Sequence, residues 1–125
     1  MPRASRSNNR ARAPGIGLDI VEIGRIRAVA RRSPRFLARV FSPEEIRYCQ
    51  GKRRAWQHFA VRFAAKEAVW KALGDGRLAL RDISVSRDPD GRPGVLLKGK
   101  PARGIQLSLT HSDHYAAAVA LRLGR

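Results

Sequence analysis

The chain has 125 residues, 43% of them hydrophobic, and a formal net charge of +16. These values fit one globular domain and exclude a disordered chain, and no apolar run approaches the ~20 residues that a membrane helix needs. The N-terminus lacks the apolar core of a secretion signal, and the one cysteine, Cys49, cannot form an internal disulfide. We therefore expect a cytoplasmic protein with no membrane partner. The charge predicts an acidic or phosphorylated partner, but it does not distinguish nucleic acid from an acidic protein or a phosphorylated ligand.

The first residues differ in composition from the remainder. Residues 1–14 hold four arginines, no acid and little apolar bulk. Such a segment cannot bury enough apolar surface to fold, so we predict a disordered basic leader. The single domain is expected to occupy residues 15–125.

The ordered part is predicted to begin with a strand in GIGLDIVEI, residues 15–23. Its apolar residues Ile16, Leu18 and Ile20 alternate with other residues, which is the period of a strand with one face in the core. These three are predicted to face that core. Asp19 then falls on the opposite face.

Helical periodicity follows the strand. From Glu22 the apolar residues recur at helical spacing until Ser33-Pro34 interrupts them. SPEE begins another helix, with Ser42 as the cap and Glu45 completing a capping box. Gly74-Asp75-Gly76 is the signal that ends the last helix. The helices are predicted over about 22–32, 42–51 and 55–73.

The last third of the sequence predicts β structure. DISVS and GVLLK flank the turn-rich DPDGRPG and indicate a hairpin, and IQLSLTH alternates as a strand. YAAAVALRL suits a helix by alanine propensity, but the alternation of Val119, Leu121 and Leu123 after a turn favours a strand. The order of one strand, several helices and then several strands indicates an α+β domain.

Four polar residues could carry chemistry: Asp19, Glu67, Lys71 and His111. Each also has a plain structural explanation. Asp19 could turn the chain where strand gives way to helix, Glu67 and Lys71 could be a helix-surface pair worth ~0.2–0.5 kcal/mol, and His111 could be a surface residue at a strand end. Yet Glu67 has the apolar neighbours Phe63, Ala64 and Trp70 one turn away. A carboxylate among apolar side chains needs a partner that offsets its lost hydration, either Lys71 or a metal ion.

Taken together, these residues indicate a magnesium and phosphate site. Two carboxylates, Asp19 and Glu67, can give Mg²⁺ two oxygen ligands, and the ion takes its others from water and substrate phosphates. Lys71 would lie near those phosphates, and His111 could meet a further one. One cysteine and three scattered histidines give no zinc pattern, and no P-loop is present.

Three motifs resemble those of the holo-acyl-carrier-protein synthase family, the small 4′-phosphopantetheinyl transferases. They are GIGLDIVEIGRI, RFAAKEAVWKALG and SLTHSDHYAAAVA, in the family's order and roughly its spacing over residues 15–123. The resemblance implies an antiparallel sheet packed against a long central helix, in a trimer with interfacial active sites. The loop GDGRLALRD is shorter than the family's glycine-rich stretch, which lines the coenzyme site.

The resemblance also implies roles for individual residues. Asp19 and Glu67 match the magnesium ligands, and with Lys71 they form the catalytic set. The coenzyme A-binding positions correspond to Arg62, Lys66, Lys71 and His111, the last acting across a subunit boundary. The positions that dock the acidic acyl carrier protein correspond to Arg25, Arg32 and Arg35.

The implied reaction moves the phosphopantetheine of coenzyme A onto a serine of an apo acyl carrier protein and releases adenosine 3′,5′-bisphosphate. The serine proton goes to a metal-bound water or to one of the carboxylates. The alternative is a basic nucleic-acid-binding protein, which the charge of +16 would suit. Against it, only 6% of residues are aromatic, no recognition motif is present, and charge alone does not require an inward-facing Glu67. We expect no nucleic-acid partner.

Overall fold

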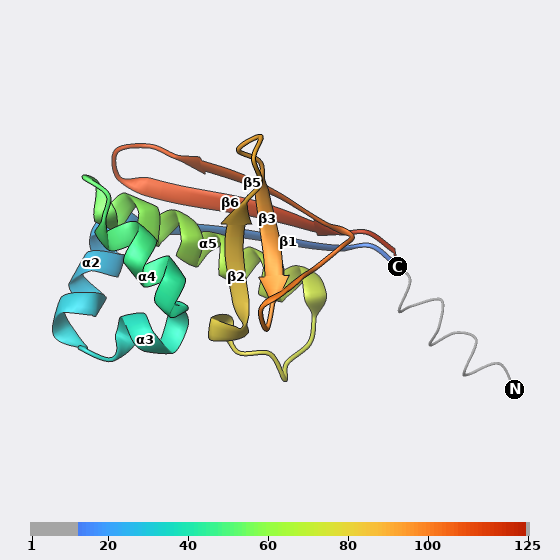
Figure 1. Ribbon diagram of the computed structural model, residues 1–125, viewed down its shortest axis with the longest axis horizontal. Helices are drawn as coiled ribbons and strands as arrows, with labels where there is room; N and C mark the ends of the chain where they lie inside the picture. Colours follow the sequence, from blue (N-terminus) through green and yellow to red (C-terminus); the bar gives the residue numbers. More distant parts are fainter. Residues whose placement is uncertain (1–12, 125) are drawn as a thin grey trace, which may run out of the picture.

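The structure is a computed structural model that describes residues 13–124, and apart from residues 13 and 14 the predicted leader lies outside them. One long helix, α5, runs along the molecule with a sheet on one side and a hairpin and short helices on the other (Figure 1). The elements in chain order are β1 (Gly15–Glu22), α2 (Ile23–Arg32), α3 (Phe36–Val40), α4 (Pro43–Gln50), α5 (Ala55–Leu73), the 3-10 turn η1 (Leu80–Asp82), β2 (Ile83–Arg87), β3 (Pro93–Leu97), β4 (Lys100–Pro101), β5 (Ile105–His111) and β6 (Tyr115–Arg122). The α+β prediction is confirmed.

The helix boundaries follow the local signals in the sequence. At the start of α4 the Ser42 hydroxyl accepts a hydrogen bond from the Glu45 amide at 3.2 Å, and the Glu45 carboxylate accepts one from the Ser42 amide at 3.0 Å. This is the predicted capping box. The helix α5 ends where Gly74 adopts φ +66°, a conformation that glycine reaches without steric cost. The short helix α3 was not assigned from the sequence.

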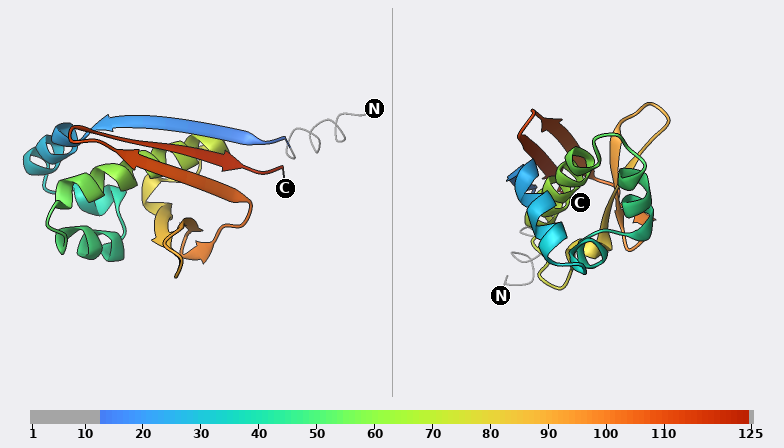
Figure 2. Two further views of the ribbon diagram at one scale, coloured as in Figure 1. Left: turned by 90° about the horizontal axis from the view of Figure 1, so that it is seen from above. Right: turned by 90° about the vertical axis from the view of Figure 1, so that its left-hand side faces the viewer.

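The strands form two antiparallel sheets, in the orders β1-β6-β5 and β2-β3-β4. The β2-β3 hairpin is the predicted one, and the alanine-rich segment is strand β6, as its alternation indicated. Figure 2 shows β1, β6 and β5 lying as a long sheet along α5, with α2, α3 and α4 at one end. In this sheet β1 lies against the C-terminal half of α5, with Gly17 beside Ala68 and Gly15 beside Ala72.

The predicted orientation of β1 is wrong. Ile16, Leu18 and Ile20 are 71%, 66% and 65% exposed, so they lie on the outer face of the sheet and not in the core. The inner face carries Gly17 and Asp19, together with the alanines and leucines of β6 and β5 that are paired with them. The alternation was read correctly, but apolar character did not identify the buried face, because here the smallest residues face the helix.

Two glycines let β1 approach α5 closely. A methyl group built on Gly17 would lie 1.8 Å from the carbonyl oxygen of Ala68, and one on Gly15 would lie 2.1 Å from that of Ala72. Real atoms cannot approach so closely, so only glycine permits this spacing. It brings the next inner residue of the strand, Asp19, against the same helix.

The core has two parts joined by α5, and most residues of that helix are buried. One cluster lies between α5 and the two sheets, around Ala65, Ala68 and Val69. The other lies between α5 and the helices α2–α4, around Phe41 and Phe59. Among residues 13–124 no helix is long and apolar enough to cross a membrane.

The approach of β1 to α5 can be tested with Gly17→Ala. The added methyl group must push β1 away from Ala68, and we expect the free energy of unfolding to fall by about 3 kcal/mol. The measurement is chemical denaturation followed by circular dichroism. Gly24→Ala is the matched control, because nothing lies within 4 Å of its added Cβ; in the helix α2 it should stabilise by up to ~1 kcal/mol. Equal effects of the two substitutions would contradict the close approach.

Candidate functional site

Three of the predicted residues meet where β1 crosses α5. The Lys71 ammonium lies 3.4 Å from Asp19 Oδ1 and donates a hydrogen bond to the Leu18 carbonyl at 2.9 Å. The side chain of Lys71 is 49% exposed, whereas that of Asp19 is only 16% exposed. Lys71 of α5 thus contacts both a backbone carbonyl and a side-chain carboxylate of β1, and its ammonium reaches them from the solvent-exposed side.

Glu67 is the third member of this group, one turn before Lys71 on α5. Its carboxylate is half-buried, and burial first, then the negative charge of Asp19, raise the pKa of Glu67, while Lys71 acts in the opposite sense. The two carboxylates are therefore close enough to repel one another. The second Asp19 oxygen, Oδ2, is buried and has no hydrogen-bond partner. A buried carboxylate oxygen without a donor, in a side chain near a second carboxylate, suits a cation.

The described residues contain no group of three or more histidine, cysteine, aspartate or glutamate side chains that could hold a metal ion. The protein therefore offers a pair of carboxylates at this point and not a complete cage. Mg²⁺ is commonly held in this way, by one or two carboxylates together with water and substrate phosphates. The residues present fit such an ion.

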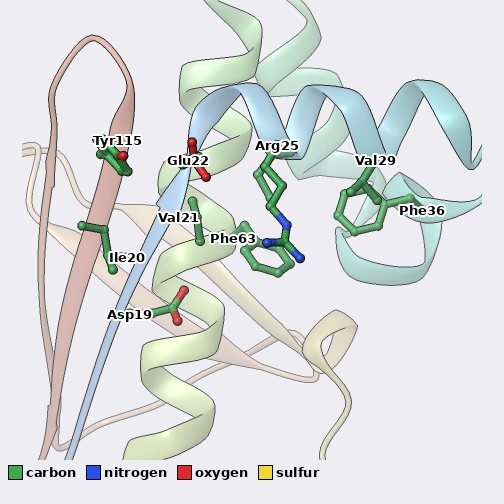
Figure 3. Close-up of a pocket in the computed structure, with 10 residues that line it drawn as sticks. Asp19, Ile20, Val21, Glu22, Arg25, Val29, Phe36, Phe63 and Tyr115 are labelled. Carbon is green, nitrogen blue, oxygen red and sulfur yellow. The ribbon is translucent and has the colours of Figure 1, made fainter.

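A pocket of about 470 Å³ opens beside Asp19, between β1, α2 and α5. Figure 3 shows the Arg25 side chain extending from α2 towards Phe63, with Asp19 further along β1. Phe36 and Tyr115 add apolar surface to the lining. The pocket thus combines an apolar wall with two acidic residues, Asp19 and Glu22, and one guanidinium, that of Arg25.

Lys66 lies elsewhere. Its side chain is fully buried, and the ammonium lies 2.6 Å from the Glu45 carboxylate. It also donates to the backbone carbonyls of Leu80 and Ile83, while the Glu45 carboxylate accepts from the Val85 amide. Burial lowers the pKa of Lys66, and Glu45 opposes that shift. The predicted contact of Lys66 with the coenzyme stays a prediction, but the structure gives this lysine an internal ion pair that joins α4, α5 and β2.

Arg62 and His111 belong to a second, cationic group. The Arg62 guanidinium is 5% exposed and lies 4.2 Å from the centre of the Tyr48 ring. His58 packs edge-on against the same ring at 5.8 Å. Burial lowers the pKa of His58, and so do the positive charges of Arg62, Lys52, Arg87 and His111. The charged groups that shift the pKa of His58 are all cationic, so positive charge gathers around this histidine, although Glu44, Glu45 and Asp82 line a pocket beside it together with Arg62.

This cationic group borders a pocket of about 750 Å³ that includes Tyr48, Arg62 and Arg87 in its lining. The pocket that contains Asp19 shares none of these residues. The structure therefore brings Asp19, Glu67 and Lys71 together, and it gathers Arg62 and His111 around His58. It does not unite the two groups within the described part of one chain.

The predicted docking arginines, Arg25, Arg32 and Arg35, are all exposed on α2 or just after it. Only Arg25 lines the pocket beside Asp19. Arg32, at the end of α2, and Arg35, just after it, are also exposed but do not line this pocket.

Several residues around these sites were not found from the sequence. Glu45 was recognised only as part of a capping box, because its partner Lys66 is distant in the chain. Phe36, Phe63 and Tyr115 carry no signal beyond being aromatic. A weak sign of the second group was present, since Tyr48, Lys52 and His58 follow one another around a run of basic residues.

The chain matches, over residues 15–120, the family model described as the 4′-phosphopantetheinyl transferase superfamily. Among curated proteins it is 45% identical over 116 residues to the holo-[acyl-carrier-protein] synthase of Koribacter versatilis, covering 83% of this chain and 93% of that protein. It is 46% identical over 115 residues to the enzyme of the same name from Moorella thermoacetica, covering 84% and 90%.

Solved structures show the same fold. A holo-(acyl-carrier-protein) synthase from Bacillus anthracis in complex with CoA (3′,5′-ADP) superimposes with a TM-score of 0.73 at 32% identity, covering 86% of this chain and 93% of that one. The Chronobacterium ammoniagenes ACPS-CoA complex superimposes with a TM-score of 0.76 at 30% identity, covering 90% and 99%. Both relatives were solved with coenzyme A or a part of it bound.

Proposed function

Because this chain belongs to the 4′-phosphopantetheinyl transferase superfamily, we propose that it is a holo-acyl-carrier-protein synthase. It transfers the 4′-phosphopantetheine of coenzyme A to a serine of an apo acyl carrier protein. The observation that carries the proposal is the pairing of Asp19 with Glu67, in which one buried carboxylate oxygen has no partner. The names of the relatives and the coenzyme A in their structures support the same activity.

In this reaction the serine hydroxyl attacks the β-phosphorus of coenzyme A. A new oxygen–phosphorus bond forms, the bond to the bridging oxygen of the diphosphate breaks, and adenosine 3′,5′-bisphosphate leaves. Asp19 and Glu67 would hold a Mg²⁺ ion. When bound, that ion supplies positive charge that neutralises the diphosphate and orients it.

The protein's own cations complete the charge balance. Lys71 lies beside Asp19 on the exposed side, where its ammonium can stabilise negative charge that builds on the leaving oxygens. Lys66 is better suited to position the site than to touch the coenzyme, because its buried pair with Glu45 fixes α5 against β2. Rigid support of this kind holds catalytic groups in register.

The nucleotide end of the coenzyme is assigned to the cationic group around Arg62 and His111. Since one chain does not unite this group with the carboxylates, the proposal includes a homotrimer in which a neighbouring copy supplies it. The exposed apolar face of the sheet supports this arrangement. Its members are Ile16, Leu18, Ile20, Val119 and Leu123, and such a surface on a small protein usually marks an interface.

The carrier protein is expected to dock on the basic surface of α2. Arg25, Arg32 and Arg35 are exposed there, and Arg25 borders the pocket that contains Asp19. An acidic carrier would be attracted to this surface and would present its serine near the carboxylates. Whether that carrier serves fatty-acid or polyketide synthesis does not change the chemistry.

The nucleic-acid-binding alternative gains no support from the comparisons, all of which point to a transferase. The net charge of +16 has a use in the proposed reaction, because both the coenzyme and the carrier are anionic. We place the reaction in the cytoplasm as part of the same proposal, since Cys49 is a free, buried thiol that suits a reducing compartment.

The activity can be tested by weighing an apo acyl carrier protein by mass spectrometry after incubation with this protein, coenzyme A and Mg²⁺. We expect the carrier to gain one phosphopantetheine, and a chelator to prevent the gain. Glu67→Gln should lower the rate by ~100-fold or more, because it removes one charged group at the reacting centre. Asp90→Asn in the exposed β2-β3 turn is the matched control and should keep full activity. No gain of mass across several apo carriers would contradict the proposed function.

The docking surface can be tested with Arg25→Glu, which places a negative charge beside an acidic partner. At low salt we expect the KM for the carrier to rise about tenfold, with the KM for coenzyme A nearly unchanged. Arg92→Glu makes the same charge change in the hairpin loop, away from α2, and should have little effect. An unchanged carrier KM in Arg25→Glu would remove Arg25 from the docking surface.

The proposed trimer can be tested with Leu18→Asp, which puts a charge on the outer face of β1. We expect the unmodified protein to sediment as a trimer and the variant as a monomer, because an unpaired charge is costly to bury in an interface. Ala38→Asp, on the exposed side of α3, should leave the trimer intact. A trimer that survives Leu18→Asp would place the interface elsewhere.

A further inference from the structure

Lys71 makes two contacts with β1 from a position that is half open to solvent. Its ammonium is 2.9 Å from the Leu18 carbonyl oxygen and 3.4 Å from Asp19 Oδ1. Both partners are more than fifty residues away in the chain, so these contacts are set by the fold and not by helix geometry. The ammonium therefore holds one oxygen of the carboxylate whose other oxygen is buried without a partner.

The charges at this point cannot be satisfied by Lys71 alone. Asp19 and Glu67 together carry two negative charges, and Lys71 supplies one positive charge. Asp19 Oδ2 is buried without a hydrogen-bond partner, so Lys71 leaves part of the negative charge uncompensated and the two carboxylates repel one another. A divalent cation would remove that repulsion. It would also repel the ammonium, because the two positive charges would share the same carboxylate.

We propose that Lys71 competes with the divalent cation for Asp19 and is transferred from this carboxylate to the diphosphate when coenzyme A binds. The inference rests on the proposed function and extends it to the way in which the site is loaded. Cation and coenzyme then favour each other's binding. The coenzyme gives Lys71 an alternative anionic partner, and this leaves Asp19 to the cation.

The exposure of Lys71 is what makes such an exchange feasible. Its side chain is 49% exposed, and an ion pair in contact with water contributes little to stability, so it can be broken at small cost. The pair of Lys66 with Glu45 offers the contrast, because it is fully buried and hydrogen-bonded to two backbone carbonyls. The same helix thus carries one lysine that is fixed and one that can exchange partners.

The test measures the binding of Mn²⁺ alone, by the electron paramagnetic resonance signal of the free ion, to the intact protein without carrier or coenzyme. If Lys71 competes for Asp19, Lys71→Met should bind Mn²⁺ about fivefold or more tightly than the unmodified protein. Coenzyme A should then raise the Mn²⁺ affinity of Lys71→Met by a smaller factor than that of the unmodified protein. Circular dichroism and thermal unfolding confirm that the variant is folded.

Arg25→Gln is the control for general charge effects, since Arg25 lines the pocket beside Asp19 but, within the described residues, forms no ion pair with Asp19. It should change the Mn²⁺ affinity less than Lys71→Met does. An affinity of Lys71→Met that is equal to that of the unmodified protein, or no greater than that of Arg25→Gln, overturns the competition. If the unmodified protein binds no Mn²⁺ even with coenzyme A present, the metal part of the proposed function fails as well.

Discussion

The close contact between the backbone of β1 and the helix α5 is the constraint on which the site depends. Gly15 and Gly17 allow the strand to lie against the carbonyl groups of Ala72 and Ala68, closer than any side chain would permit. The next inward-facing residue of the strand is Asp19. Because no loop or hinge separates Asp19 from the two glycines, the strand itself positions Asp19 beside Glu67 and Lys71. A pair of like-charged groups is costly to assemble, and rigid elements supply the restraint that holds it together.

The same contact explains where sequence reasoning succeeded and where it failed. The capping box at Ser42, the glycine that ends α5 and the alternation of β5 are local signals, and each identified its element correctly. The buried face of β1 was assigned wrongly, because we assumed that Ile16, Leu18 and Ile20 must face the core. In this sheet, small residues face the helix so that the backbones can approach, and the large apolar residues point outward. Periodicity reports that two faces differ, but it does not report which face a neighbouring element covers.

The polar interactions of the interior show a second limit. Lys66 and Glu67 are adjacent in the sequence; the resemblance suggested a coenzyme contact for Lys66, whereas the apolar neighbours of Glu67 had already suggested a metal ligand. Adjacent residues on a helix point about 100° apart, and in the fold Lys66 meets Glu45 and the start of β2 while Glu67 meets Asp19. The partners come from different elements, so no local pattern contains them. The carboxylate pair that we propose as metal ligands could be predicted, because the chemistry of a magnesium site requires carboxylates. The buried ion pair of Lys66 with Glu45 could not be predicted, because nothing in the sequence motif around Lys66 requires Glu45 as a partner.

The distribution of charge joins these features to the proposed reaction. A chain with a net charge of +16 places Asp19 and Glu67 near each other at a point where a half-exposed lysine, Lys71, contacts Asp19. The larger cationic group around His58 borders another pocket, in which Arg62 and Arg87 lie beside Glu44, Glu45 and Asp82. An anionic substrate with phosphates at two places would therefore find two different environments. Under the proposed function, the surface around His58 would accept a phosphate directly, whereas the carboxylates at Asp19 and Glu67 would repel one until a cation binds between them. The order in which positive charge reaches Asp19 would then decide when the diphosphate binds, and Lys71, which contacts Asp19, is the group proposed to exchange between the two anions.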